Sequence, residues 1–160
     1  MNLQDFFDIQ TWHPLTVHFP IAFLSLSGLL SIYLLFKFQK TIAQFNLGLL
    51  FLGVITALIS LYTGDIEDGK VSRTLCDPTI LKDHENFAYY SVYAFSACLV
   101  LWSVKLFASY KKFKTLFISL IFILNLAGLA GLVYVGHLGA SLVYEQAAGV
   151  DVPSEDCSDF

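Results

Sequence analysis

The sequence predicts an all-α integral membrane protein: a four-helix bundle that runs up-down-up-down, with both termini outside. Three observations support this prediction. The chain is 56% hydrophobic and 14% charged, with a mean hydropathy of +0.67, which is too apolar for a water-soluble domain. Four nearly uncharged runs are each long enough to cross a hydrocarbon core of about 30 Å. The basic residues gather in two of the connections, which sets the orientation.

These runs make residues 1–160 a single transmembrane domain. The predicted spans lie near residues 15–36, 42–63, 87–109 and 115–136, with an outer loop at 64–83 and an outer tail at 145–160. Lysines in short loops stay on the cytoplasmic side, so the first and third connections should face inward. The lysines that flank them are Lys37, Lys40, Lys105, Lys111, Lys112 and Lys114. Such short inner loops exclude a cytoplasmic domain that binds nucleotide or nucleic acid.

The first span opens with the stretch TWHPLTVHFPIAF, residues 11–23, which holds two prolines and two histidines. Pro14 suits the first position of a helix, where a missing N–H costs nothing. Pro20 removes the hydrogen bond to the carbonyl of Thr16, so we expect a kink there. In lipid the freed carbonyl must find a partner within the protein.

The other three helices have their own boundary signals. Thr63 and Gly64 should mark the exit of the second helix, and Asp83 is a good N-cap for the third. Counted from Lys114, the fourth helix should run past the hydrocarbon to about Tyr144. Its small residues recur at helical spacing and would let another backbone approach closely; they are Ala127, Gly128, Gly131, Gly136 and Ala140. No sequence repeat between the two helical pairs is evident.

All four histidines should gather at the outer end of the bundle. About 20 residues outward from each inner boundary, His18 of the first helix and His137 of the fourth reach the same depth. First and fourth helices are usually neighbours in such a bundle, which makes His18 and His137 the better pair for a shared ligand. His13 and His84 form a second, outer pair. Neutral imidazole is a common ligand of haem iron, copper and zinc.

Two kinds of cofactor suit these histidines. In a b-type haem site His18 and His137 would be the axial ligands, and the propionates would meet Arg73, Lys70 or Lys82. In a zinc or copper site three or four of the histidines would bind the metal, with Asp65 or Glu85 as a further ligand. His13 and His84 are candidate ligands in both the haem site and the metal site.

A different function class also fits. Histidines at a membrane interface often only cap helices, and the chain would then be a non-catalytic assembly or scaffold subunit that packs through the small residues of its fourth helix. No charged residue lies mid-span, which disfavours transport, and no nucleophile and base pair is visible, which disfavours an enzyme. The partners we expect are the lipid bilayer and a redox partner such as a cytochrome, another membrane subunit or a second copy of the chain.

Three cysteines complete the chemistry. Cys76 and Cys157 fall in the outer loop and tail, where an oxidising compartment would allow a disulfide, and two free thiols are the alternative. Cys98 lies mid-membrane and should serve packing. No CxxC or CxxCH motif occurs, which argues against covalently bound c-type haem.

The motifs HPLTVHFPIAF, YTGDIEDG and HLGASLVYEQAAGV, with a histidine opening the third helix, resemble the bacterial family known as domain of unknown function 2231. The resemblance covers nearly the whole chain and implies a small bacterial membrane protein with four spans. With the orientation that the lysines set, we expect it in the inner membrane with periplasmic termini. The resemblance also implies a respiratory or cytochrome-like context. Ala140 stands where a second glycine is common, and AAGV where His-Gly-Val is frequent, so one further ligand candidate is missing here.

Overall fold

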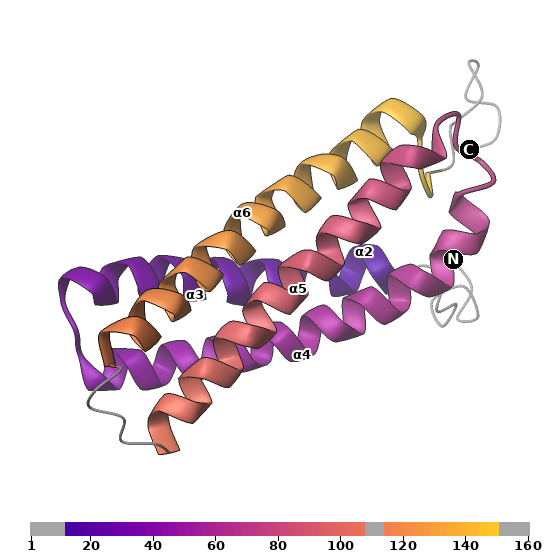
Figure 1. Ribbon diagram of the computed structural model, residues 1–160. Coiled ribbons are helices and arrows are strands. Elements are labelled where there is room, and N and C mark those ends of the chain that lie inside the picture. The colour runs from indigo at the N-terminus through magenta and orange to yellow at the C-terminus, as the bar shows by residue number, and fades with distance from the viewer. Residues whose placement is uncertain (1–11, 108–113, 151–160) are drawn as a thin grey trace.

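The computed structural model describes residues 12–107 and 114–150, and this part of the chain is helical apart from short connections (Figure 1). The helices are α2 (Trp12–Thr16), α3 (His18–Phe36), α4 (Lys40–Val71), α5 (Pro78–Phe107) and α6 (Lys114–Gln146). Four stretches are long and apolar enough to cross a membrane: Trp12–Phe36, Lys40–Val71, Pro78–Val104 and Leu116–Gln146. The predictions of an all-α chain and of four apolar helices long enough to cross a membrane are confirmed.

The first helix is interrupted at Val17, between α2 and α3. Pro20 has no N–H for the carbonyl of Thr16, and the break falls at this turn, as the sequence predicted. Hydrogen bonds continue on either side, from the N–H of Val17 to the carbonyl of His13 (3.1 Å) and from the N–H of Ile21 to that of Val17 (3.2 Å). The helix is already formed at Trp12, two residues before the predicted start at Pro14. The interruption therefore lies between the two histidines of this segment.

The second and third helices extend farther than predicted. Helix α4 continues through Thr63 and Gly64 to Val71, so the predicted exit at Thr63 and Gly64 is wrong. A glycine can stay helical, and the acidic residues that follow it suit a helix that projects beyond the apolar layer into water. The predicted loop 64–83 is thereby reduced to the connection at residues 72–77.

Helix α5 begins at Pro78, so the predicted cap at Asp83 is wrong as well. The cap is Asp77, whose Oδ1 accepts from the N–H of Thr79 at 2.9 Å and from its hydroxyl at 2.6 Å. Asp77 followed by Pro78 is a standard opening of a helix, because proline at the first position loses no hydrogen bond. At the same end of the α5–α6 pair, where the N–H of Asp77 donates to Gln146 Oε1 at 2.9 Å, α6 reaches Gln146, which confirms the predicted extension to about Tyr144.

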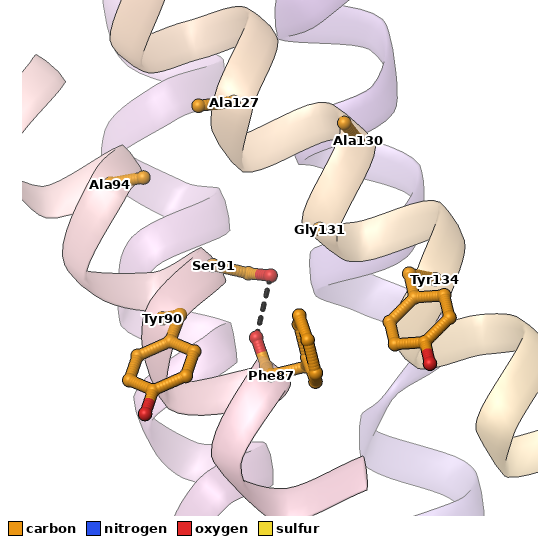
Figure 2. A pocket seen from close by; sticks show the side chains of 8 residues that line it. All are labelled: Phe87, Tyr90, Ser91, Ala94, Ala127, Ala130, Gly131 and Tyr134. Atoms are coloured by element: carbon orange, nitrogen blue, oxygen red, sulfur yellow. Dashed lines mark hydrogen bonds between the residues drawn. The ribbon is translucent and has the colours of Figure 1, made fainter. Parts of the chain in front are cut away.

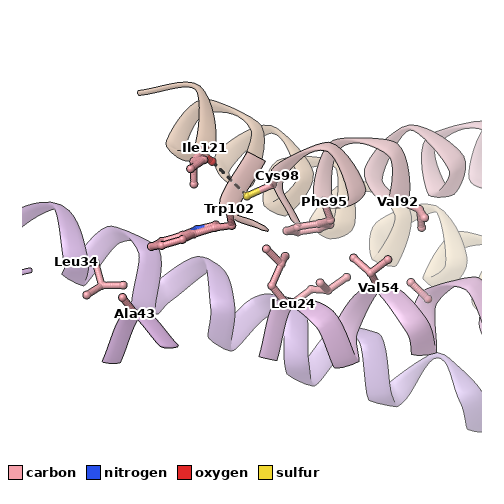
Figure 3. Packing of buried hydrophobic residues seen from close by; sticks show 11 residues of the cluster. Leu24, Leu34, Ala43, Val54, Val92, Phe95, Cys98, Trp102 and Ile121 are labelled. Carbon is pink, nitrogen blue, oxygen red and sulfur yellow. Dashed lines mark hydrogen bonds between the residues drawn. The ribbon is translucent and has the colours of Figure 1, made fainter. Parts of the chain in front are cut away.

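The helices pack as two antiparallel pairs, α3 with α4 and α5 with α6, and α4 contacts α5 between them (Figure 1). The hydrophobic core lies where the pairs meet (Figure 3). There Leu24 of α3 packs against Gly53 of α4, and Phe95 of α5 packs against Gly128 of α6. A Cβ added at Gly128 would lie 2.9 Å from the ring of Phe95. The two glycines let the helices of each pair approach closely.

Polar groups in this core form contacts between the helices. Asn46 Nδ2 of α4 donates to Ser31 Oγ of α3 at 2.9 Å, and Asn125 Nδ2 of α6 contacts Cys98 Sγ of α5 at 3.9 Å. Each pair thus has one buried asparagine that reaches the other helix of the pair. Cys98 is fully buried, as expected for a packing role.

The two helix pairs repeat the same arrangement. Eleven residues separate His13 from Leu24, and eleven separate His84 from Phe95. On the second helix of each pair, eleven residues separate Gly53 from Gly64 and Gly128 from Gly139. The buried positions of the first helices also correspond: Pro20, Leu24, Ser27 and Ser31 in one, and Ser91, Phe95, Cys98 and Trp102 in the other. The sequence shows few identities at these positions, so the repeat is visible only in the structure.

Candidate functional site

The structure brings His13 and His84 together. Their ring centroids lie 6.4 Å apart, and the ring planes cross at 88°. His13 belongs to α2 and His84 to the first turns of α5, so each pair of helices contributes one imidazole. We call the end of the bundle that holds these two residues the histidine end.

His18 and His137 are exposed, and in the described residues no hydrogen bond or ring contact joins them. The prediction from the sequence used depth alone and ignored direction around the helix. At about 100° per residue, His18 lies roughly 140° around the helix from His13. His137 lies two residues before Gly139, the α6 residue that contacts His84, and hence on a different face. The geometry therefore favours His13 and His84, the second pair of the prediction.

His13 is held by three groups of α4. Its Nδ1 lies 2.9 Å from the carbonyl of Ser60, and its backbone N–H donates to Glu67 Oε1 at 3.0 Å. The ring rests on Gly64, where an added Cβ would lie 3.0 Å from Cε1 of the imidazole. Nearby, the hydroxyls of Thr16 and Thr63 lie 3.0 Å apart and tie α2 to α4. The residues between Ser60 and Glu67 thus form a cradle for the first imidazole.

His84 is held by α6 in the equivalent way. Its Nδ1 lies 3.0 Å from the carbonyl of Val135, and its Cε1 would lie 3.3 Å from a Cβ added at Gly139. In both cradles the carbonyl and the glycine are four residues apart, one turn of helix. The repeat noted in the core therefore extends to the site.

These contacts settle which ring nitrogen is available. A carbonyl oxygen can only accept, so Nδ1 carries the proton in both rings, and Nε2 keeps its lone pair. Histidines that bind metals almost always donate the other ring N–H to a backbone carbonyl or carboxylate, which fixes the ring and its tautomer. In this tautomer each ring can bind a ligand through Nε2.

The acidic residues near the site already have partners, and Glu67 accepts from the backbone N–H of His13. Asp65 accepts from the hydroxyl of Tyr89 at 2.9 Å, and Glu85 forms an ion pair with Lys82. Within residues 12–107 and 114–150 no group of three or more His, Cys, Asp and Glu side chains is arranged to hold a metal ion. In this part of the chain no third side chain of these types is therefore grouped with the two imidazoles.

Two basic residues expected near haem propionates and one cysteine lie in the described residues around the end of α4 and the connection to α5. Arg73 and Lys70 are exposed near the end of α4. Cys76 is exposed in the connection before α5. Cys157 lies outside the described residues, so the Cys76–Cys157 disulfide stays a prediction.

Sequence reasoning missed the supporting residues of the site. The carbonyls of Ser60 and Val135 leave no trace in residue type, because any residue supplies a carbonyl. Gly64 and Gly139 did leave a signal, since a glycine inside an apolar helical pattern often marks a close approach. At Gly64 this signal was attributed to the end of the second helix.

Four membrane-length helices with a pair of supported imidazoles at one end define the class of this protein: a small polytopic membrane protein with a candidate ligand site. Comparison with known families gives the affiliation. The family described as predicted membrane protein (DUF2231) matches residues 10–152, and the chain belongs to it. No curated protein and no solved structure matches the sequence.

Proposed function

We propose that His13 and His84 are the axial ligands of a b-type haem and that the protein transfers electrons at the extracytoplasmic face of the bacterial inner membrane. The observation that carries this proposal is the pair of Nδ1 contacts to backbone carbonyls, which leaves two Nε2 atoms ready to bind. Haem iron needs only one or two protein ligands, because the porphyrin supplies the rest. When bound, the haem would supply one-electron chemistry.

The ligand count favours haem over a metal ion held by protein alone. Zinc takes three or four protein ligands, and the described residues offer two imidazoles with no third ligand grouped with them. The spacing agrees: with metal–nitrogen bonds of about 2 Å, two imidazoles on opposite sides of one ion have ring centres about 6 Å apart. The ring centroids of His13 and His84 are 6.4 Å apart.

The orientation is part of the proposal. Lys37 and Lys40 lie at the connection between α3 and α4, which is at the opposite end of these helices from His13 and Glu67. Lysines in short loops stay in the cytoplasm, so the histidine end should face outward in an up-down-up-down bundle with both termini outside. A redox partner would then approach from the outer surface.

Absorbance spectra of the protein extracted from membranes test the proposal. We expect a Soret band that shifts on reduction with dithionite in the wild type, and its loss in His13→Ala and in His84→Ala. His18→Ala and His137→Ala are matched controls, because both change an exposed histidine of the same bundle, and they should keep the band.

Two results would overturn the proposal. One is a well-folded wild type, purified from cells supplied with a haem precursor, that shows no Soret band. The other is a band that survives in both His13→Ala and His84→Ala. Stoichiometric zinc or copper by mass spectrometry, without a Soret band, would favour the metal instead.

A further inference from the structure

The two imidazoles of the site are held by different means, although the helix pairs that carry them repeat. His84 stands in a helix that already begins at Pro78, so its backbone N–H lies within the helical hydrogen-bonding pattern. His13 is the second residue of α2, and a backbone N–H in the first turn of a helix has no partner within that helix. The position of the first imidazole therefore depends on contacts outside its own helix.

Glu67 of α4 supplies the acceptor for this N–H. Its side chain is half-buried, and Oε1 accepts from the backbone N–H of His13 at 3.0 Å. One turn earlier on α4 stands the buried Thr63, whose hydroxyl lies 3.0 Å from that of Thr16. Helix α2 has five residues, which is too few for a helix to be stable on its own. These contacts with α4 therefore hold α2, and with it the imidazole, in place.

None of these three polar side chains recurs in the second helix pair. The two histidines and the two glycines that they contact fix the equivalent positions. There the second pair has apolar side chains in place of Thr16, Thr63 and Glu67, and these are Phe87, Leu138 and Leu142. Instead of two hydroxyls, the rings of Phe87 and Tyr134 meet between α5 and α6, with centroids 4.6 Å apart (Figure 2). The polar support is thus confined to the side of His13 and is not a general result of the helix packing.

We propose that Glu67 is a positioning residue that fastens His13, and only His13, as a ligand of the site, so that the two axial ligands are held unequally. A hydrogen bond from an N–H to a carboxylate is stronger than one to a neutral oxygen, which suits this task. Without Glu67, α2 can move away from α4 and carry His13 with it, while His84 stays on its continuous helix. The proposal deepens the proposed function and rests on it where the ligand is haem.

Carbon monoxide binding to the reduced protein measures how readily an axial histidine leaves the iron, because the gas needs a free axial position. Glu67→Leu inserts the residue type of the second pair and should accelerate binding about tenfold or more, since outer partners of metal-binding histidines are typically worth about 10–100-fold. Glu67→Gln keeps an oxygen that can accept from the N–H of His13, so it should restore a rate close to that of the wild type. Asp68→Leu is the matched control, because it removes an equal charge from the next, also half-buried position of α4 and should leave the rate unchanged.

Hydrogen–deuterium exchange gives a second measurement that needs no haem. In the protein purified without added haem, Glu67→Leu should raise the exchange rate of the α2 amides about tenfold or more, because their helix is no longer fastened to α4. Exchange in the segment around His84 should stay as in the wild type, since Glu67 supports only the first imidazole.

Three results would contradict the proposal: a Glu67→Leu variant that binds carbon monoxide at the wild-type rate, a Glu67→Gln variant as fast as Glu67→Leu, and an Asp68→Leu variant that accelerates binding equally. If no Soret band forms in the wild type but Glu67→Leu still speeds exchange in α2 alone, the haem proposal fails and the positioning of His13 by Glu67 stands. Failure of the one proposal and failure of the other are therefore distinguishable.

Discussion

Replacement of Gly64 by alanine should weaken the histidine site even though alanine favours the helix. An alanine Cβ at this position would lie 3.0 Å from Cε1 and 3.1 Å from Nδ1 of His13. Ordinary carbon contacts begin near 3.5 Å, so the ring must move by roughly half an ångström. It would move away from α4 and strain the 2.9 Å contact between Nδ1 and the carbonyl of Ser60.

The stability change is the sum of two opposing effects. Alanine is about 1 kcal/mol better than glycine in a helix interior, while overpacking of a close contact costs about 1–3 kcal/mol. Gly64→Ala should therefore be neutral to destabilising by about 2 kcal/mol. Gly69→Ala is the matched control on the same helix: nothing lies within 4 Å of its added Cβ, so it should gain the helix-propensity term alone.

Thermal unfolding in detergent, followed by circular dichroism, measures both variants, and the Soret band reports the site. We expect Gly69→Ala to melt at or above the wild type and to keep the band. Gly64→Ala should melt lower than Gly69→Ala and bind haem more weakly. Equal melting and equal spectra of the two variants would refute the role assigned to the glycine.

Three further predictions concern the rest of the bundle. Gly53→Ala should destabilise the protein by about 1–3 kcal/mol in thermal melts, because the new Cβ would lie 2.7 Å from Cγ of Leu24; no loss would contradict this packing. Hydrogen bonds from Thr79 lower the pKa of Asp77 below its ordinary value of 3.8, so the charged form stabilises the fold above that pH. This stabilisation should disappear as the pH falls through the lowered pKa, and Asp77→Asn should flatten the acid limb of the melting curve; an unchanged acid limb would argue against this cap. Gly136→Leu tests the scaffold alternative, because nothing lies within 4 Å of its added Cβ: stability should be unaffected, and loss of a co-purifying partner in this variant would favour a scaffold.

Much of the fold could be predicted because the apolar runs dominate it. The kink near Pro20 followed from a missing N–H, and the long fourth helix from the distance between Lys114 and Tyr144. Helix ends in water were harder to predict, since a glycine such as Gly64 is equally compatible with a turn and with a helix that a side chain approaches closely. Asp77 with Pro78 carried the better capping signal, and Asp83 was preferred only because the span was assumed to begin later.

The candidate site could be predicted only in part. Depth counting grouped His13 with His84 as an outer pair, and their rings lie 6.4 Å apart, but depth says nothing about direction around the helix. The choice between the pairs depended on the register of α2 against α4 and of α5 against α6, which is set by close approaches such as that of Leu24 to Gly53. Tertiary packing of this kind has no local sequence signature, which is also why the repeat of the two pairs went unseen.

Electron paramagnetic resonance of the oxidised protein tests the central claim most directly, because it reports both the number of axial imidazoles and their relative orientation. The rings of His13 and His84 cross at 88°, so we predict a low-spin ferric signal of the strongly anisotropic kind that perpendicular imidazole planes give, and its loss in His84→Ala. A high-spin ferric signal in the wild type, or a spectrum that His84→Ala leaves unchanged, would contradict it.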